Sequence, residues 1–164
     1  MSAKRQWALV CVAVVALVAA LVGCTHLFTG SRVPTLLLGE VTITADRGQI
    51  LLSAKNMPDG GLASVAVTLG GIIYDVAKID NVSVEGLSGF EVPAQQFAGG
   101  NGGFVLVHPS AGLPAGAFAK ITFDATGDPT LADFAFSKGD ISLADDSYHA
   151  VSFQLQDEYA YYAK

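Results

Sequence analysis

Beyond residue 35, apolar residues occur in short runs separated by turn residues, and no window keeps a 3.6-residue period over three turns. The pattern is clearest at residues 62–69, where Val65, Val67 and Leu69 alternate with small or polar residues. A period of two is that of a strand with one buried face. The alternation therefore predicts an all-β fold.

Turn residues divide this region into the expected strands. These cover residues 36–44, 49–55, 62–69, 72–79, 82–87, 90–97, 104–108, 117–125, 131–136, 141–143 and 150–156, of which some are short or irregular. About nine strands at intervals of 8–12 residues predict a jelly-roll-like β-sandwich. In the strand at 117–125, the alternation of Ala119, Ile121 and Phe123 predicts that these three side chains face the core.

The first 24 residues have a different character. Lys4 and Arg5 precede an apolar run at residues 7–22, which ends at Gly23 and Cys24. This pattern resembles a bacterial lipoprotein signal: a basic head stays cytoplasmic, an apolar segment enters the bilayer, and small residues precede the cleavage site. The resemblance implies cleavage before Cys24 and lipidation of its sulfur. An uncleaved membrane anchor is the alternative, since the run is only slightly shorter than the roughly 17–25 residues of a spanning helix.

Three segments follow from this interpretation. Residues 1–23 are the signal peptide, residues 24–35 are a tether containing Gly30 and Pro34, and residues 36–164 form one domain. The expected location is the cell envelope, outside the cytoplasm, with a lipid anchor in the membrane. Loss of Lys4 and Arg5 from nine basic residues leaves seven against fifteen acids, a formal charge of −8. A chain this acidic is a poor partner for nucleic acid.

The order and spacing of two regions resemble the cohesin-like family of β-sandwiches, which is similar in architecture to several carbohydrate-binding modules. The first is Gly-Leu-Ala-Ser-Val-Ala-Val-Thr-Leu at residues 61–69 with Tyr74-Asp75 soon after. The second is Gly-Ala-Phe-Ala-Lys-Ile-Thr-Phe at residues 116–123, leading to Ile-Ser-Leu-Ala-Asp at 141–145. Two departures are the inserted Gly-Gly-Ile-Ile before Tyr74 and Val76, where many members have proline. Cohesins bind dockerins, so the resemblance implies a protein-binding module.

The sequence presents no nucleophile with a matching acid or base, so we expect no enzyme activity. The histidines have no second ligand at metal spacing, and we expect no transition metal or other cofactor. Calcium remains an open alternative, because carboxylate oxygens suit it. The candidate calcium ligands are Asp124, Asp128, Asp133, Asp140, Asp145 and Asp146.

Two functions remain in competition. The first is a non-catalytic protein-binding or envelope-assembly module, whose partner is an envelope or secreted protein. The second is a carbohydrate-binding module of the cell surface. Glycan binding is less favoured because the sole tryptophan, Trp7, lies in the leader, and sugar platforms rely on exposed aromatic rings. The candidate binding residues for either ligand are Tyr148, Tyr159, Tyr161 and Tyr162, the last three forming a final packed strand or an adhesive end.

Overall fold

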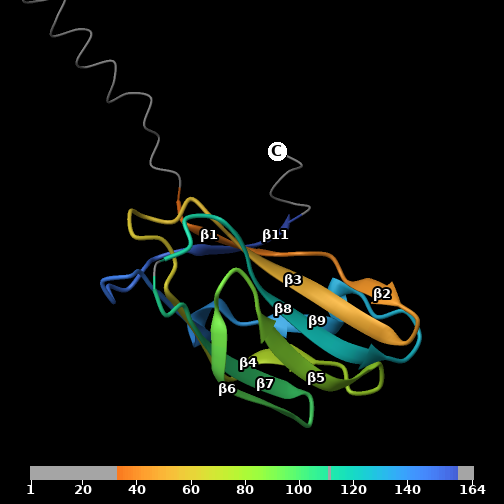
Figure 1. The fold of residues 1–164 in the computed structure, drawn as a ribbon. Coiled ribbons are helices and arrows are strands. Elements are labelled where there is room, and N and C mark those ends of the chain that lie inside the picture. The colour runs from red at the N-terminus through yellow and green to blue at the C-terminus, as the bar shows by residue number, and fades with distance from the viewer. Residues whose placement is uncertain (1–32, 111, 159–164) are drawn as a thin grey trace, which may run out of the picture. The chain divides into compact units, whose positions relative to one another are not determined.

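The expected strands form two facing sheets in the computed structural model, which describes residues 33–110 and 112–158 (Figure 1). Eleven strands are present in that part of the chain. The predicted all-β sandwich is confirmed. The expected strand at 36–44 is divided in two by the segment around Gly39, whose N–H donates to the Leu51 carbonyl at 2.8 Å.

The first sheet has six strands. Its order is β11 (Gln154–Asp157), β1 (Thr35–Leu38), β3 (Arg47–Lys55), β8 (Gly116–Ala125) and β5 (Ile79–Gly86), and β2 (Thr42–Thr44) pairs with β3. The chain-terminal strands β1 and β11 are parallel, while the other pairs are antiparallel. Residues from opposite ends of the domain are therefore neighbours in one sheet.

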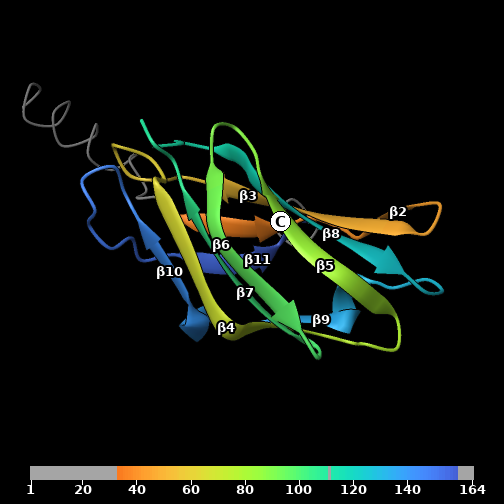
Figure 2. The ribbon, with the colours of Figure 1, turned by 60° about the horizontal axis from the view of Figure 1, so that its bottom comes forward.

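The second sheet has five strands. Its order is β10 (Ile141–Ala144), β4 (Ser64–Tyr74), β7 (Asn101–Val107) and β6 (Glu91–Ala98), and β9 (Phe134–Phe136) pairs with β4. Figure 2 shows β10, β4, β7 and β6 side by side. Two single-turn 3₁₀ helices, Leu131–Asp133 and Lys138–Asp140, flank β9.

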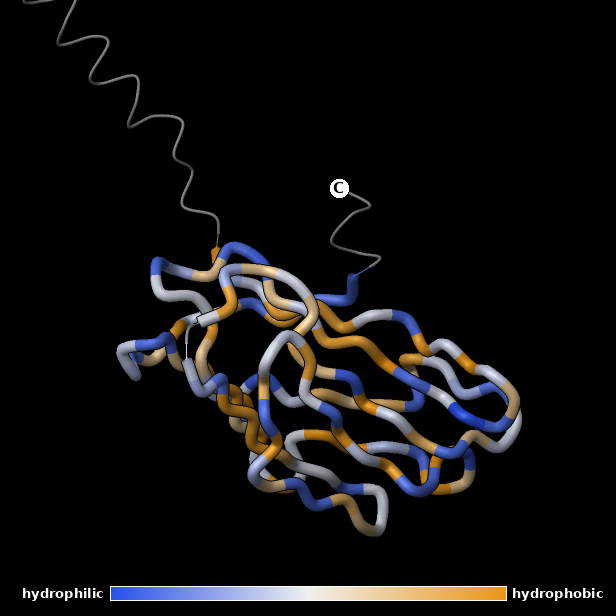
Figure 3. Tube along the Cα trace, viewed as in Figure 1, coloured by the Kyte–Doolittle hydropathy of each residue, from blue (hydrophilic) through white to orange (hydrophobic). Residues whose placement is uncertain are grey.

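The core lies between the sheets. Hydrophobic and hydrophilic residues alternate along the strands (Figure 3), and the apolar set faces inward. Ala119 and Ile121 are fully buried and Phe123 is 2% exposed, which confirms the predicted register of β8. The alternation identified the buried face correctly because each of these residues lies two positions from the next.

The predicted strands at 62–69 and 72–79 are wrong as separate elements, because one strand, β4, runs through both. Gly70 adopts a φ of 92°, and together with Gly71 it lets the strand bulge and continue. After Tyr74 the chain turns instead of extending. The Asp75 side chain accepts a hydrogen bond from the Ala77 N–H at 2.9 Å and fixes that turn.

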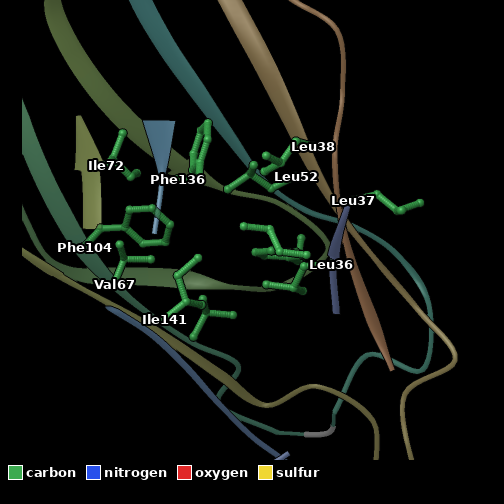
Figure 4. A pocket seen from close by; sticks show the side chains of 12 residues that line it. Leu36, Leu37, Leu38, Leu52, Val67, Ile72, Phe104, Phe136 and Ile141 are labelled. Atoms are coloured by element: carbon green, nitrogen blue, oxygen red, sulfur yellow. The ribbon is translucent and has the colours of Figure 1, made fainter. Parts of the chain in front are cut away.

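A small apolar cavity of about 20 Å³ lies between the sheets (Figure 4). Leu36 of β1 points into it and Leu37 points away, as strand alternation requires. The volume suits about one water molecule, yet all twelve lining residues are apolar, so a water would have no hydrogen-bond partner. We interpret this cavity as a packing gap and not as a ligand site.

Candidate functional site

The two sheets differ sharply in charge. The strands of the five-stranded sheet contain one charged residue, Glu91, at the start of β6. The strands of the six-stranded sheet contain seven: Arg47, Lys55, Asp80, Glu85, Lys120, Asp124 and Asp157. The outer face of the five-stranded sheet is thus the distinctive surface of the domain.

On the six-stranded sheet, outward polar side chains largely bond one another. Lys120 pairs with Glu85 at 2.7 Å, and Ser83 shares a hydrogen bond with Thr122 at 2.8 Å. Asp124 accepts a hydrogen bond from the Asn81 side chain at 2.7 Å. This ladder of cross-strand pairs already satisfies its members.

The outward side chains of β4, β6, β7 and β10 are small, apolar or uncharged. We call this surface the neutral face and define it by Ser64, Ala66, Ala94, Gln96, Val105, Val107 and Ser142, which alternate with core residues along their strands. Ala66 lies opposite both Val105 and Ser142 in the register. These pairs create a continuous uncharged surface across the centre of the sheet.

The neutral face contains a hollow of about 250 Å³, lined by residues of β4, β6 and β7. It adjoins the β-bulge of β4, where the register with β7 shifts between Val67 and Ile72. Gly103 lies beneath this bulge, where a Cβ atom would come within 2.7 Å of the Thr68 carbonyl group. A side chain at that position would therefore displace the backbone and change the hollow.

Three large apolar side chains are exposed on this sheet. Leu69 on the bulge is 60% exposed, Ile73 is 51% exposed, and Val107 is 36% exposed. Leu69 also lines the hollow. Sequence reasoning missed these residues, although the absence of charge across β4 and β7 was visible as a signal.

Tyr148 lies in the loop that follows β10, and it is 84% exposed. Its φ of 62° is unusual for a bulky residue. The Asp145 side chain fixes the loop by accepting hydrogen bonds from the N–H groups of His149 at 2.8 Å and Ser147 at 3.0 Å. These bonds, that of His149 first, hold the pKa of the Asp145 carboxyl below its usual value.

Of the predicted site residues, only Tyr148 is within the described part of the chain. Tyr159, Tyr161, Tyr162 and Cys24 lie outside it, as does the whole predicted signal peptide. Within residues 33–110 and 112–158, no helix is long and apolar enough to cross a bilayer.

The six aspartates considered for calcium do not gather at one point. Asp124 binds Asn81, Asp133 binds Lys78 at 2.7 Å, and Asp140 accepts a hydrogen bond from Thr68 at 3.1 Å. In the described part of the chain, no three acidic, histidine or cysteine residues are grouped to hold a metal ion.

No protein-family model and no curated protein matches the sequence. The fold is similar to a type I cohesin in a cohesin–dockerin complex from Clostridium thermocellum, with a TM-score of 0.57 and 17% identity over 76% of this chain and 94% of that chain. It is also similar to the sixth cohesin of scaffoldin B from Acetivibrio cellulolyticus, solved with a dockerin. The TM-score is 0.54, with 16% identity over 74% of this chain and 94% of that chain.

The seventh type I ScaB cohesin from Pseudobacteroides cellulosolvens gives a TM-score of 0.56 and 16% identity, over 76% of this chain and 86% of that chain. These structures establish that the chain has a cohesin-like β-sandwich fold.

Proposed function

We propose that this domain is a non-catalytic protein-binding module and that the neutral face, with its hollow, is the contact surface. The observation that carries the proposal is the near absence of charge from the five-stranded sheet, together with the exposed Leu69 and Ile73. Apolar and small side chains cost little to desolvate, whereas an unpaired charge buried in an interface costs several kcal/mol. The opposite sheet is less suited, because a partner would bury its ion pairs.

The fold comparison supports the same class of function. Two of the similar cohesins were solved in complexes with dockerins, which are proteins. The partner that we propose for this chain is an envelope or secreted protein. Tyr148 extends from the loop beyond β10, the outermost strand of the same sheet, and supplies an aromatic anchor of the kind that dominates interface energetics.

The test is capture of partners from detergent-solubilised envelopes, with the proteins identified by mass spectrometry. Ala66→Arg and Val105→Arg each place a charge at the centre of the neutral face, and each should reduce capture of the specific partner by about tenfold or more. Thr122→Arg on the opposite sheet is the matched control and should leave capture unchanged. If Ala66→Arg and Val105→Arg captured the partner as well as Thr122→Arg does, the neutral face would be refuted as the contact surface.

Tyrosine variants define the edge of the surface. Tyr148→Ser should weaken capture without changing the fold, since its ring forms no aromatic pair or hydrogen bond among the described residues. Joint replacement of Tyr159, Tyr161 and Tyr162 with serine should also leave the fold intact, and a loss of capture would assign the tail to the interface.

We also propose that the domain is lipid-anchored through Cys24 in the cell envelope. The basic residues, apolar run and Gly23-Cys24 of the leader support this proposal. Full-length protein should partition with membranes and yield a mature mass that starts at residue 24 with added diacylglycerol. Cys24→Ala should lose the lipid. A mature chain without diacylglycerol, or one that is never cleaved, would overturn the anchor.

A further inference from the structure

A cleft of about 500 Å³ opens at one end of the sandwich, where β4 ends at Tyr74, β5 begins at Ile79 and β6 ends at Ala98. In Figure 2 the β6–β7 turn and the start of β5 lie at this end. The lining combines the rings of Tyr74 and Phe97, aliphatic Val76 and Val82, and polar Asp80 and Asn81. It shares no residue with the neutral face.

Tyr74 is the unusual member of this lining. Its side chain is part of the core, at 9% exposure, and its ring centroid lies 6.4 Å from those of both Phe97 and Phe134. Among the described residues its hydroxyl forms no hydrogen bond, and no buried side-chain polar atom there lacks a partner. The hydroxyl must therefore reach solvent.

Phenylalanine would fill the same core position without a polar atom to satisfy. Because buried tyrosines normally bond their hydroxyl to a protein partner, the unpaired group of Tyr74 is available to a ligand in the cleft that it lines. The hydroxyl both donates and accepts, which suits a partner that is itself a hydroxyl.

The turn beside the cleft is held in place. The Tyr74 N–H donates to the Gly100 carbonyl at 2.9 Å. A Cβ atom on Gly100 would lie 3.0 Å from the backbone carbonyl oxygen of Tyr74 and 3.2 Å from Val76 Cγ1. Gly99 has a φ of 58° and open space where its Cβ would stand. The glycine pair thus fixes one wall of the cleft without filling it.

We propose that this cleft binds one sugar ring of a neutral or cationic saccharide. Its volume lies within the range of small-molecule sites, about 300–1,000 Å³. Phe97 and Val76 offer apolar contacts to the C–H faces of a pyranose ring. The Tyr74 hydroxyl, Asp80 Oδ2 and Asn81 Oδ1 form no hydrogen bond with the described residues, and they offer polar partners to the sugar hydroxyls. Asp80 is the one charged residue among those that line the cleft, so an anionic sugar is disfavoured by repulsion.

The experiment uses the full-length chain in a polyoxyethylene detergent, which has no sugar headgroup to compete. Calorimetry and saturation-transfer NMR measure binding of glucose, glucosamine, N-acetylglucosamine, cellobiose and glucuronate. We expect saturable binding of at least one uncharged sugar with a dissociation constant on the order of millimolar. Glucosamine should bind more tightly than glucuronate.

Tyr74→Phe should weaken that binding about fivefold or more while the thermal midpoint stays unchanged, because it removes a hydroxyl that no described residue uses. Asp80→Asn should reduce the difference in affinity between glucosamine and glucuronate. Tyr148→Ser is the control outside the cleft and should bind sugar as the native chain does.

Two results would overturn the saccharide site. One is the absence of saturable binding by all five sugars at about 50 mM, a concentration far above the expected dissociation constant. The other is equal binding by the native and Tyr74→Phe chains. Neither result bears on the protein-binding proposal, which Ala66→Arg and Val105→Arg test separately on the neutral face.

Discussion

The side-chain amide of Gln95 forms two hydrogen bonds with the backbone of Val84. Its Oε1 accepts from the Val84 N–H at 2.6 Å, and its Nε2 donates to the Val84 carbonyl at 3.3 Å. Gln95 belongs to β6 and Val84 to β5, the edge strands of different sheets. The amide therefore takes the place of a neighbouring strand at this edge of β5 and ties the two sheets together.

Replacement of Gln95 with alanine should lower the free energy of unfolding by about 1 kcal/mol, because the two backbone groups of Val84 lose a partner at a partly buried edge. Urea unfolding measures the change. Gln96→Ala is the control, since Gln96 is exposed on the neutral face and the effect should stay within about 0.5 kcal/mol. Equal effects would mean that the Gln95 bonds contribute nothing to stability.

The core register of β8 gives a second test. Ile121→Ala should cost roughly 2–5 kcal/mol, because Ile121 is fully buried between the sheets. Thr122→Ala on the outer face should cost far less. A loss below about 0.5 kcal/mol for Ile121→Ala would contradict the inward orientation of this side chain.

The start of the domain can be tested by truncation. The Pro34 carbonyl accepts a hydrogen bond from the Gln154 N–H at 2.8 Å, and Thr35 in β1 is 2% exposed, so the ordered packing begins before Leu36. A chain of residues 33–164 should be a soluble β domain by circular dichroism, with cooperative unfolding. A chain that starts at Leu36 should be about 1–3 kcal/mol less stable, through loss of that bond and of the buried Thr35. Equal stability would show that residues 33–35 are dispensable.

Local patterns predicted which faces are buried but not how strands continue. Val65 and Ile121 could be assigned from alternation, because the side-chain period of a strand is a local property. The pair Gly70 and Gly71 indicated a turn, whereas β4 passes through it as a bulge. Whether two glycines form a turn or a bulge depends on whether the residues that follow them pair with a strand of the same sheet. A local sequence pattern does not contain that information.

In the candidate site, too, local features could be predicted from the sequence, whereas features that depend on strand pairing could not. That Tyr148 is exposed agrees with its selection as a binding residue, although its role stays a prediction. The neutral face could not be assigned, because it requires knowing that β10, β4, β7 and β6 are neighbours. Gln95 reads as an outward polar residue, and only the spatial approach of β5 gives its amide a partner.

The ion pair between Lys78 and Asp133 gives the domain a pH dependence. Lys78 Nζ donates to Asp133 Oδ1 at 2.7 Å, and the Thr130 N–H donates to Asp133 Oδ2 at 2.8 Å. The bond from Lys78, followed by that from Thr130, lowers the pKa of Asp133 below 3.8, and the bond to Asp133 raises the pKa of Lys78 above 10.5.

The lowered pKa of Asp133 and the raised pKa of Lys78 determine how the stability of the fold changes with pH. A carboxyl with a lowered pKa stabilises the fold above its unfolded pKa of 3.8, and this stability is lost as the pH falls through the lowered value. The raised pKa of Lys78 acts oppositely: its stabilisation is complete below 10.5 and is lost as the pH rises through the raised value. The pair contributes fully across the neutral range.

Asp133→Asn should therefore be less stable than the native chain at pH 7, and the difference should shrink as the pH falls below 3.8 and the native carboxyl becomes protonated. Urea unfolding at a series of pH values from 2 to 7 measures this difference. Asp128→Asn is the control, because Asp128 is exposed in the same connection and forms no hydrogen bond with the described residues. A difference between Asp133→Asn and the native chain that stays constant down to pH 2 would show that the carboxylate charge of Asp133 does not stabilise the fold.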